Sequence, residues 1–125
     1  MSDTIKIPSK IESRNVIDRL HWAAKSRLRK VYQLFIRQEM SHYRLKKAEP
    51  GEKFILELTT FRKRRIGDHD NLVGGAKQMI DALVHEGFIW DDDTKFIGKP
   101  SIAQMKSKEE CTIIRREKIN RKEKQ

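Results

Sequence analysis

The segment from Phe54 to Glu86 restricts the possible folds most, because two different periods of apolar residues follow each other within it. Residues 54–61, FILELTTF, place apolar side chains at alternate positions, which is typical of a β-strand with one buried face. From about residue 75 to 86 apolar side chains recur every three or four positions, which predicts a helix. Gly87 suits the left-handed conformation that ends many helices.

Weaker patterns predict the remaining elements. Residues 15–40 carry apolar side chains at the spacing of one long helix, namely Ile17, Leu20, Ala24, Leu28, Val31 and Phe35. Short strands are predicted at residues 4–7, near Phe96 and Ile97, and at residues 111–116. These elements predict an α/β (α+β) fold in which a small mixed sheet packs against two helices. We expect one domain over residues 1–119 and a charged, disordered tail over residues 120–125.

Charge points to a polyanionic partner. The chain has 28 Lys and Arg against 18 Asp and Glu, a formal net charge of +10. Binding a polyanion releases its condensed counterions, which favours association with a chain of this charge. Net charge by itself does not distinguish DNA from RNA or from an anionic membrane.

Other features of the composition exclude several classes of protein. We find neither an apolar run of about 20 residues nor a secretory signal at the start, so we expect a soluble, cytoplasmic protein without a membrane segment. Cys111 is the single cysteine, which excludes an internal disulfide and a cysteine zinc site. Hydrophobic and charged residues each make up 37% of the chain. A core this thin favours a homodimer, in which subunit contact buries further apolar area.

Two groups of aspartates flank the predicted helix of residues 75–86. Asp68 and Asp70 precede the helix, and Asp91, Asp92 and Asp93 follow it. The predicted strand and helix can bring both groups to one place, where hard carboxylate oxygens suit Mg²⁺. Each group alone favours an ordinary explanation, in which Asp70 or Asn71 caps the helix and residues 91–93 form a solvated loop. Both groups together, beside the basic run at residues 62–65, favour a metal-dependent enzyme acting on nucleic acid.

The stretch DHDNLVGGAKQMIDALVHEGFIWDDD, residues 68–93, resembles the core motif of the RusA family of Holliday-junction resolvases. In that family an Asp-x-Asp-Asn turn opens a helix that carries a lysine and ends in Asp-Ala-Leu, and a glycine and paired aspartates follow. The resemblance is strong over residues 64–93. It is weaker at Ser13-Arg14-Asn15 and His21-Trp22, which resemble the opening strand and first helix of the family.

The resemblance implies a dimeric endonuclease that nicks two strands of a four-way DNA junction symmetrically with Mg²⁺, or with Mn²⁺ as an alternative ion, in recombination and repair. The implied catalytic residues are Asp68, Asp70, Asp92 and Lys77, and the implied metal ligands are Asp68, Asp70, Asp92 and Asp91. The triple aspartate leaves open which of Asp91, Asp92 and Asp93 is the third essential carboxylate. The protein would act in a bacterial cell, encoded by the host or by a phage or prophage.

One departure from the family pattern affects the predicted site. Lys77 lies seven residues after Asp70, a longer spacing than in the family, so Val73, Gly74 and Gly75 resemble a small insertion. If the helix continues through it, Asp70 and Lys77 still share one face. DNA contacts are predicted at Arg62, Lys63, Arg64, Arg65, Arg14, Lys25 and Arg29. Two alternatives remain open: a nuclease for other branched DNA such as flaps, and a non-catalytic nucleic-acid-binding protein.

Overall fold

Four strands and four helices follow one another along residues 2–119, which are the residues that the computed structural model describes. In chain order they are β1 (Ser2–Ile7), α1 (Arg14–Arg19), α2 (Trp22–His42), β2 (Phe54–Arg62), α3 (His69–Glu86), α4 (Thr94–Ile97), β3 (Ser101–Lys106) and β4 (Cys111–Lys118). The predicted tail over residues 120–125 lies outside the described residues. None of the helices within residues 2–119 is long and apolar enough to cross a bilayer.

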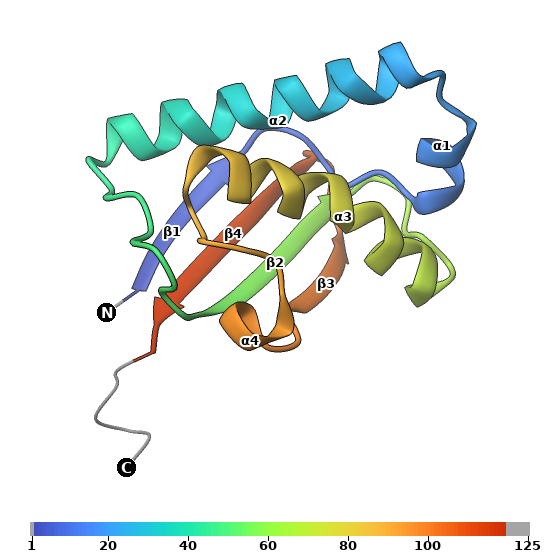
Figure 1. Cartoon of the computed structure of the whole chain (residues 1–125). Helices are drawn as coiled ribbons and strands as arrows, with labels where there is room; N and C mark the ends of the chain where they lie inside the picture. The colour runs from blue at the N-terminus through green and yellow to red at the C-terminus, as the bar shows by residue number, and fades with distance from the viewer. Residues whose placement is uncertain (1, 120–125) are drawn as a thin grey trace.

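The sheet is mixed, as predicted. Its strand order is β1-β4-β2-β3, in which β2 pairs in parallel with β3, and β4 pairs antiparallel with both β1 and β2. The parallel pair requires a crossover between β2 and β3, and α3 with α4 supplies it. Figure 1 shows the two long helices, α2 and α3, lying on the same side of the sheet. The α+β class is therefore confirmed, with two short helices that the sequence patterns did not predict.

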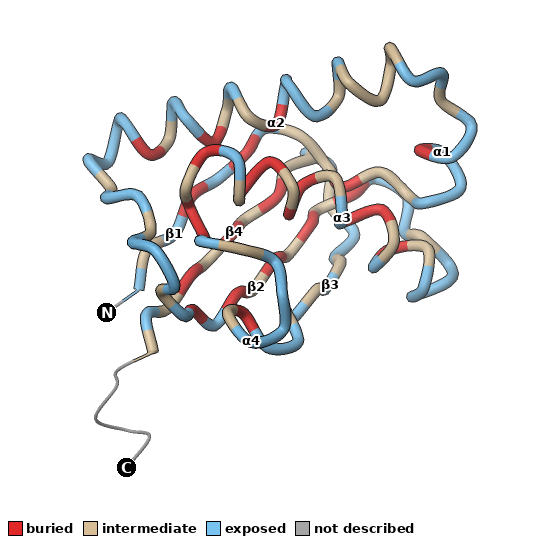
Figure 2. Tube along the Cα trace, viewed as in Figure 1, coloured by how far each residue is buried: buried red, intermediate tan, exposed pale blue. Residues whose placement is uncertain are grey.

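The core lies between the sheet and the two long helices. Alternate residues of β2, including Leu56 and Leu58, are 1% exposed, as the strand pattern predicts. They pack with Ile5 and Ile7 of β1 and with Ile114 of β4 in one apolar cluster. Figure 2 shows the buried positions gathered where the sheet and helices face each other. Within residues 2–119 no helix covers the opposite face of the sheet, which we call the open face, and Ile55 and Met105 there are 46% and 54% exposed.

The long helix predicted over residues 15–40 is wrong in one respect, since α1 and α2 are separate helices. The backbone of Leu20 is extended, at ψ 140°, which ends α1. The His21 side chain then accepts a hydrogen bond from the N–H of Ala23 and so caps the start of α2. The buried face of α2 also differs from the predicted one. Tyr32 is buried, and its hydroxyl donates to the carbonyl of Lys10, whereas Val31 is 43% exposed. An inward tyrosine with a polar partner cannot be read from apolar spacing alone.

The strand predicted near Phe96 and Ile97 is wrong, because those residues belong to α4. The Asp93 side chain accepts a hydrogen bond from the N–H of Lys95, and this cap favours a helical turn. Strand β3 begins only after Pro100. The strands predicted at residues 4–7, 54–61 and 111–116 are confirmed, with small differences at their ends, and Gly87 ends α3 at φ 84°.

Candidate metal and nucleic-acid site

The start of α3 holds the first pair of predicted carboxylates. Asp68 is the residue that caps the helix, since its carboxylate accepts a hydrogen bond of 3.0 Å from the N–H of Asp70. Its backbone carbonyl accepts from the N–H groups of Asn71 and Leu72. Both aspartates are exposed. The positive end of the helix dipole stabilises two carboxylates placed this close together.

Helix α3 runs without interruption from His69 to Glu86, through the predicted insertion. Its continuity puts Asp70 and Lys77 on one face, because seven residues turn a helix by nearly two full turns. Asp81 lies on the same face eleven residues after Asp70, at about 16 Å along the axis. We call Asp70, Lys77 and Asp81 the α3 stripe. Asp70 and Lys77 are exposed and Asp81 is half-buried.

The second acidic segment lies beside the α3 stripe. Burial raises the pKa of Asp92, its hydrogen bond with Asp91 raises it further, and the nearby charges of Asp81 and Asp91 act in the same direction. Asp92 therefore lies within electrostatic range of the α3 stripe. Asp91 accepts a hydrogen bond of 2.7 Å from the N–H of Asp92. Asp93 differs from both, since it caps α4.

The structure places the acidic residues in two separate sets and does not unite them in the one cluster that the sequence leads us to expect. Asp68 lies with Asp70, and Asp92 lies with Asp91 and Asp81. Among residues 2–119 no three His, Cys, Asp or Glu side chains form a group that could hold a metal ion. Mg²⁺ commonly takes only one or two carboxylates and completes its shell with water and substrate phosphate, so paired carboxylates are a suitable donor set.

Asp81 is a residue that sequence reasoning did not assign to the site. It is the first residue of the Asp-Ala-Leu that forms part of the resemblance, and the sequence alone indicates no role for it. Its spacing contained a usable signal, because it follows Lys77 by four residues and Asp70 by eleven, and both intervals return to the same helical face. The charge of Asp81 contributes to the raised pKa of Asp92.

The basic residues between β2 and α3 divide into two kinds. Lys63, Arg64 and Arg65 are exposed, and we call them the basic loop. Arg62 is only 9% exposed, and its guanidinium donates to the carbonyls of Arg64 and Ile11. Its donors thus hold the loop in place, and we do not include Arg62 in the proposed DNA surface.

A second basic segment lies next to the basic loop. Lys63 lines an open pocket of about 490 Å³ together with Lys106, at the end of β3, and with Ser107 and Lys108 of the turn that follows. The N–H of Ser107 donates to the carbonyl of Arg62, which fixes the turn against the end of β2. Lysines far apart in sequence therefore enlarge the basic surface. Their proximity depends on the pairing of β2 with β3, which the sequence patterns did not reveal.

The remaining predicted DNA contacts lie on the helices. Arg29 of α2 lines a groove of about 290 Å³ between α2 and α3, together with Lys30 and Asp81. Arg14 begins α1, is exposed, and lies 4.0 Å from the carboxylate of Asp18. Lys25 is half-buried near the start of α2. Of these three residues, Arg29 shares a groove with the α3 stripe.

Comparison with known proteins adds no family assignment. No protein-family model matches the chain, and no curated protein matches it.

Proposed function

We propose that this chain is an Mg²⁺-dependent endonuclease that cuts branched DNA, with the four-way junction as its substrate and a homodimer as its active form. The observation that supports the proposal most is the unbroken course of α3, which aligns Asp70 and Lys77 on one exposed face. The charge of Asp81, on that face, helps to raise the pKa of Asp92. The basic loop directly precedes it in the chain. The motif that resembles RusA resolvases spans these same residues.

Each group of residues has a distinct role in the proposed reaction. Asp68 with Asp70, and Asp92 with Asp91, would each hold Mg²⁺ as a pair completed by water and phosphate, and a bound ion would activate a water molecule and neutralise charge on the phosphate. The ammonium of Lys77 would stabilise negative charge developing on the scissile phosphate. The basic loop would bind neighbouring phosphates and orient the strand. In this scheme the protein makes no contact with the DNA bases, so it would select its substrate by the branched shape of the DNA.

The electrostatics of Asp92 support a cation in this region. Its pKa is raised by burial and by neighbouring carboxylates, so the charged form is less favourable than in an isolated aspartate. A divalent ion would oppose that effect. A bound cation would therefore reduce the repulsion between these carboxylates.

The proposed dimer is supported by the open face of the sheet. Ile55 and Met105 are exposed there, and strand register places Lys6 and Arg115 on this face together with two acidic residues, Glu57 and Glu117. These four charges cancel in a chain of net charge +10. Two copies can approach through such a face without strong repulsion, and two active sites are needed for paired nicks.

Cleavage of labelled DNA tests the proposal. The purified chain should cut a synthetic four-way junction with Mg²⁺ and remain inactive with EDTA. Asp70→Asn and Asp92→Asn should each lower the rate at least about 100-fold while junction binding persists, because they remove metal ligands and no phosphate-binding cation. Glu109→Gln removes a charge from an exposed turn residue and should leave the rate unchanged. Equal cleavage by all three variants and the parent would refute the assignment.

Two further measurements distinguish the alternatives. A flap and a linear duplex, assayed beside the junction, show whether branched DNA other than junctions is preferred. Millimolar Mg²⁺ should raise the melting temperature of the chain, because an ion that binds only the folded state stabilises it. Asp92→Asn should reduce that increase. A melting temperature insensitive to Mg²⁺, together with DNA binding but no cleavage, would favour the non-catalytic nucleic-acid-binding protein.

A further inference from the structure

Helix α2 ends in a turn whose backbone conformation is unusual for its residue. Arg44 has φ 55°, in the left-handed region where glycine is normally found. The N–H of Leu45 donates to the carbonyl of Met40 at 2.8 Å, and the N–H of Arg44 donates to that of Ser41 at 3.2 Å. These are the two bonds of a Schellman motif. A non-glycine residue in this conformation is strained, which directs attention to what its side chain does.

The same turn forms one wall of a pocket of about 390 Å³. We call it the Met40 pocket, and its lining consists of Arg37, Met40, Ser41, Arg44, Leu45, Lys47 and Glu86. Met40 is 6% exposed and Leu45 is half-buried, and in a Schellman motif the side chains at these two positions usually contact each other. They give the pocket an apolar floor. A volume of this size accommodates a small ligand or one side chain with its neighbours.

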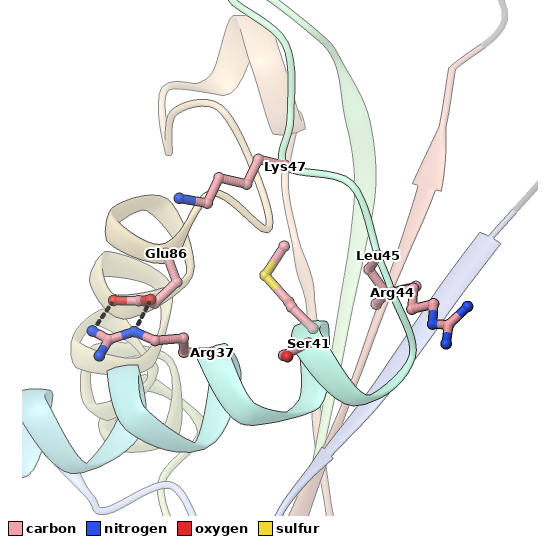
Figure 3. Close-up of a pocket in the computed structure, with 7 residues that line it drawn as sticks. Arg37, Ser41, Arg44, Leu45, Lys47 and Glu86 are labelled. Carbon is pink, nitrogen blue, oxygen red and sulfur yellow. Dashed lines mark hydrogen bonds and ion pairs between the residues drawn. The ribbon is translucent and has the colours of Figure 1, made fainter.

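Charges surround the apolar floor and are mainly positive. The carboxylate of Glu86 is buried and accepts two hydrogen bonds from Arg37, at 2.8 and 3.1 Å, which hold the guanidinium in place. With this pair neutral, Arg44 and Lys47 leave two positive charges. Figure 3 shows Lys47 extending on the side of the Arg37–Glu86 pair and Arg44 extending the other way. Cationic groups therefore flank the floor on two sides.

We infer that the Met40 pocket binds a short acidic peptide of a partner protein, with a leucine, isoleucine or phenylalanine next to its carboxylates. The cations complement the acidic residues, and the floor complements the apolar side chain. A DNA phosphate would leave the floor without a contact, and none of the seven lining residues is an aromatic on which a base could stack. Acidic peptides use both halves of the pocket.

The pocket is separate from the proposed nuclease site, so the inference does not rest on the proposed function. Glu86 follows Asp70 by sixteen residues, about 24 Å along α3, and points to a different face of the helix. A peptide bound there would recruit the chain to a partner without occupying the α3 stripe. Substitutions in the pocket should accordingly leave any nuclease activity unchanged.

Fluorescence anisotropy with three labelled peptides, each carrying Asp-Glu-Asp before Leu, Ile or Phe, tests the inference. At least one peptide should bind saturably, and replacing its apolar residue with Ser should weaken binding at least about fivefold. Arg44→Gly and Lys47→Ala should each weaken binding about three- to tenfold. Arg44→Gly also relieves the strained backbone, so its effect cannot come from unfolding. Lys6→Ala, an equal change of charge on the open face of the sheet, should alter binding less than about twofold.

Several results would overturn the inference. One is the absence of saturable binding by all three peptides up to about 1 mM. Another is equal affinity for a peptide and its Ser-substituted form, which would mean that binding depends on charge alone. A third is tighter binding of duplex DNA that depends on Arg44 and Lys47, which would make the pocket part of a nucleic-acid surface. Sedimentation showing that Arg44→Gly separates two copies of the chain would assign the pocket to self-association.

Discussion

Buried charged side chains in this protein have defined partners, and these partners fix the ends of its strands and helices. Arg116 of β4 is 3% exposed, and its guanidinium lies 5.3 and 4.5 Å from the ring centres of Phe54 and Phe88. It also donates to the carbonyls of Phe88 and Lys46. Arg62 has a comparable structural role. The alternation that buries Leu56 and Leu58 continues to Arg62, so the phase of the strand gave a usable sign that Arg62 points inward.

Glu86 carries the clearest prediction at this scale. Its pKa is lowered first by hydrogen bonds from Arg37, with further contributions from His85, against the opposing effect of burial. A carboxyl group whose pKa falls on folding adds stability above its ordinary pKa and loses it as the pH falls through the folded value. Glu86→Gln should therefore cost about 1–2 kcal/mol near neutrality and almost nothing in strong acid. Thermal unfolding over a series of pH values measures this, with Glu109→Gln as the exposed control. A loss that is the same at all pH values would contradict it.

At the level of elements, the local patterns predicted most of the fold but not the boundaries set by tertiary contacts. The alternation in β2 and the Gly87 helix end were readable because they are local. The start of α3 was predicted six residues late, since two adjacent glycines usually weaken a helix. Gly75 remains helical because it packs against the backbone carbonyl of Glu12, a contact from distant sequence. The position of Asp92 relative to Asp81 could not be predicted for the same reason, because it depends on the path that the chain takes after α3.

The two glycines make a matched test of that packing. A Cβ added at Gly75 would lie 1.7 Å from the carbonyl oxygen of Glu12, so the backbone would have to move. Gly75→Ala should destabilise the chain by about 1–3 kcal/mol. At Gly74 the added Cβ meets only the Arg14 side chain, at 2.4 Å from its Cδ, and that side chain can shift. Gly74→Ala should stay within about 1 kcal/mol of the parent, because the helix propensity of alanine offsets the displacement. Denaturant unfolding compares the two, and equal losses would mean that Gly75 makes no special contact.

Across the whole molecule, the charge of +10 is unevenly arranged. The basic loop meets Lys106, at the end of β3, and Lys108 of the following turn at one end of the sheet. The open sheet face has balanced charges, as described above. In the proposed function, DNA and a second copy of the chain would therefore use different surfaces. This arrangement of charge became visible only with the strand order, because neither the pairing of β2 with β3 nor the open face follows from local periodicity.

The basic loop should control the salt dependence of DNA binding. Each phosphate contact contributes about 0.9 to the slope of log affinity against log salt concentration. Replacing Lys63, Arg64 and Arg65 together with alanine should lower the slope by about 2–3 and weaken all DNA substrates similarly. Lys6→Ala should leave the slope unchanged. Binding of labelled duplex and junction DNA over a range of salt concentrations measures it, and an unaltered slope in the triple variant would place the DNA elsewhere.

The most direct test of the central claim is to count divalent ions bound by the free protein, using electron paramagnetic resonance of Mn²⁺ in place of Mg²⁺. If each pair of carboxylates holds an ion, Asp70→Asn and Asp92→Asn should each remove one bound ion, and the double variant should lose both. Glu109→Gln should bind Mn²⁺ like the parent. Retention of full Mn²⁺ binding by both single aspartate variants would contradict the proposed metal sites and, with them, the metal-dependent chemistry.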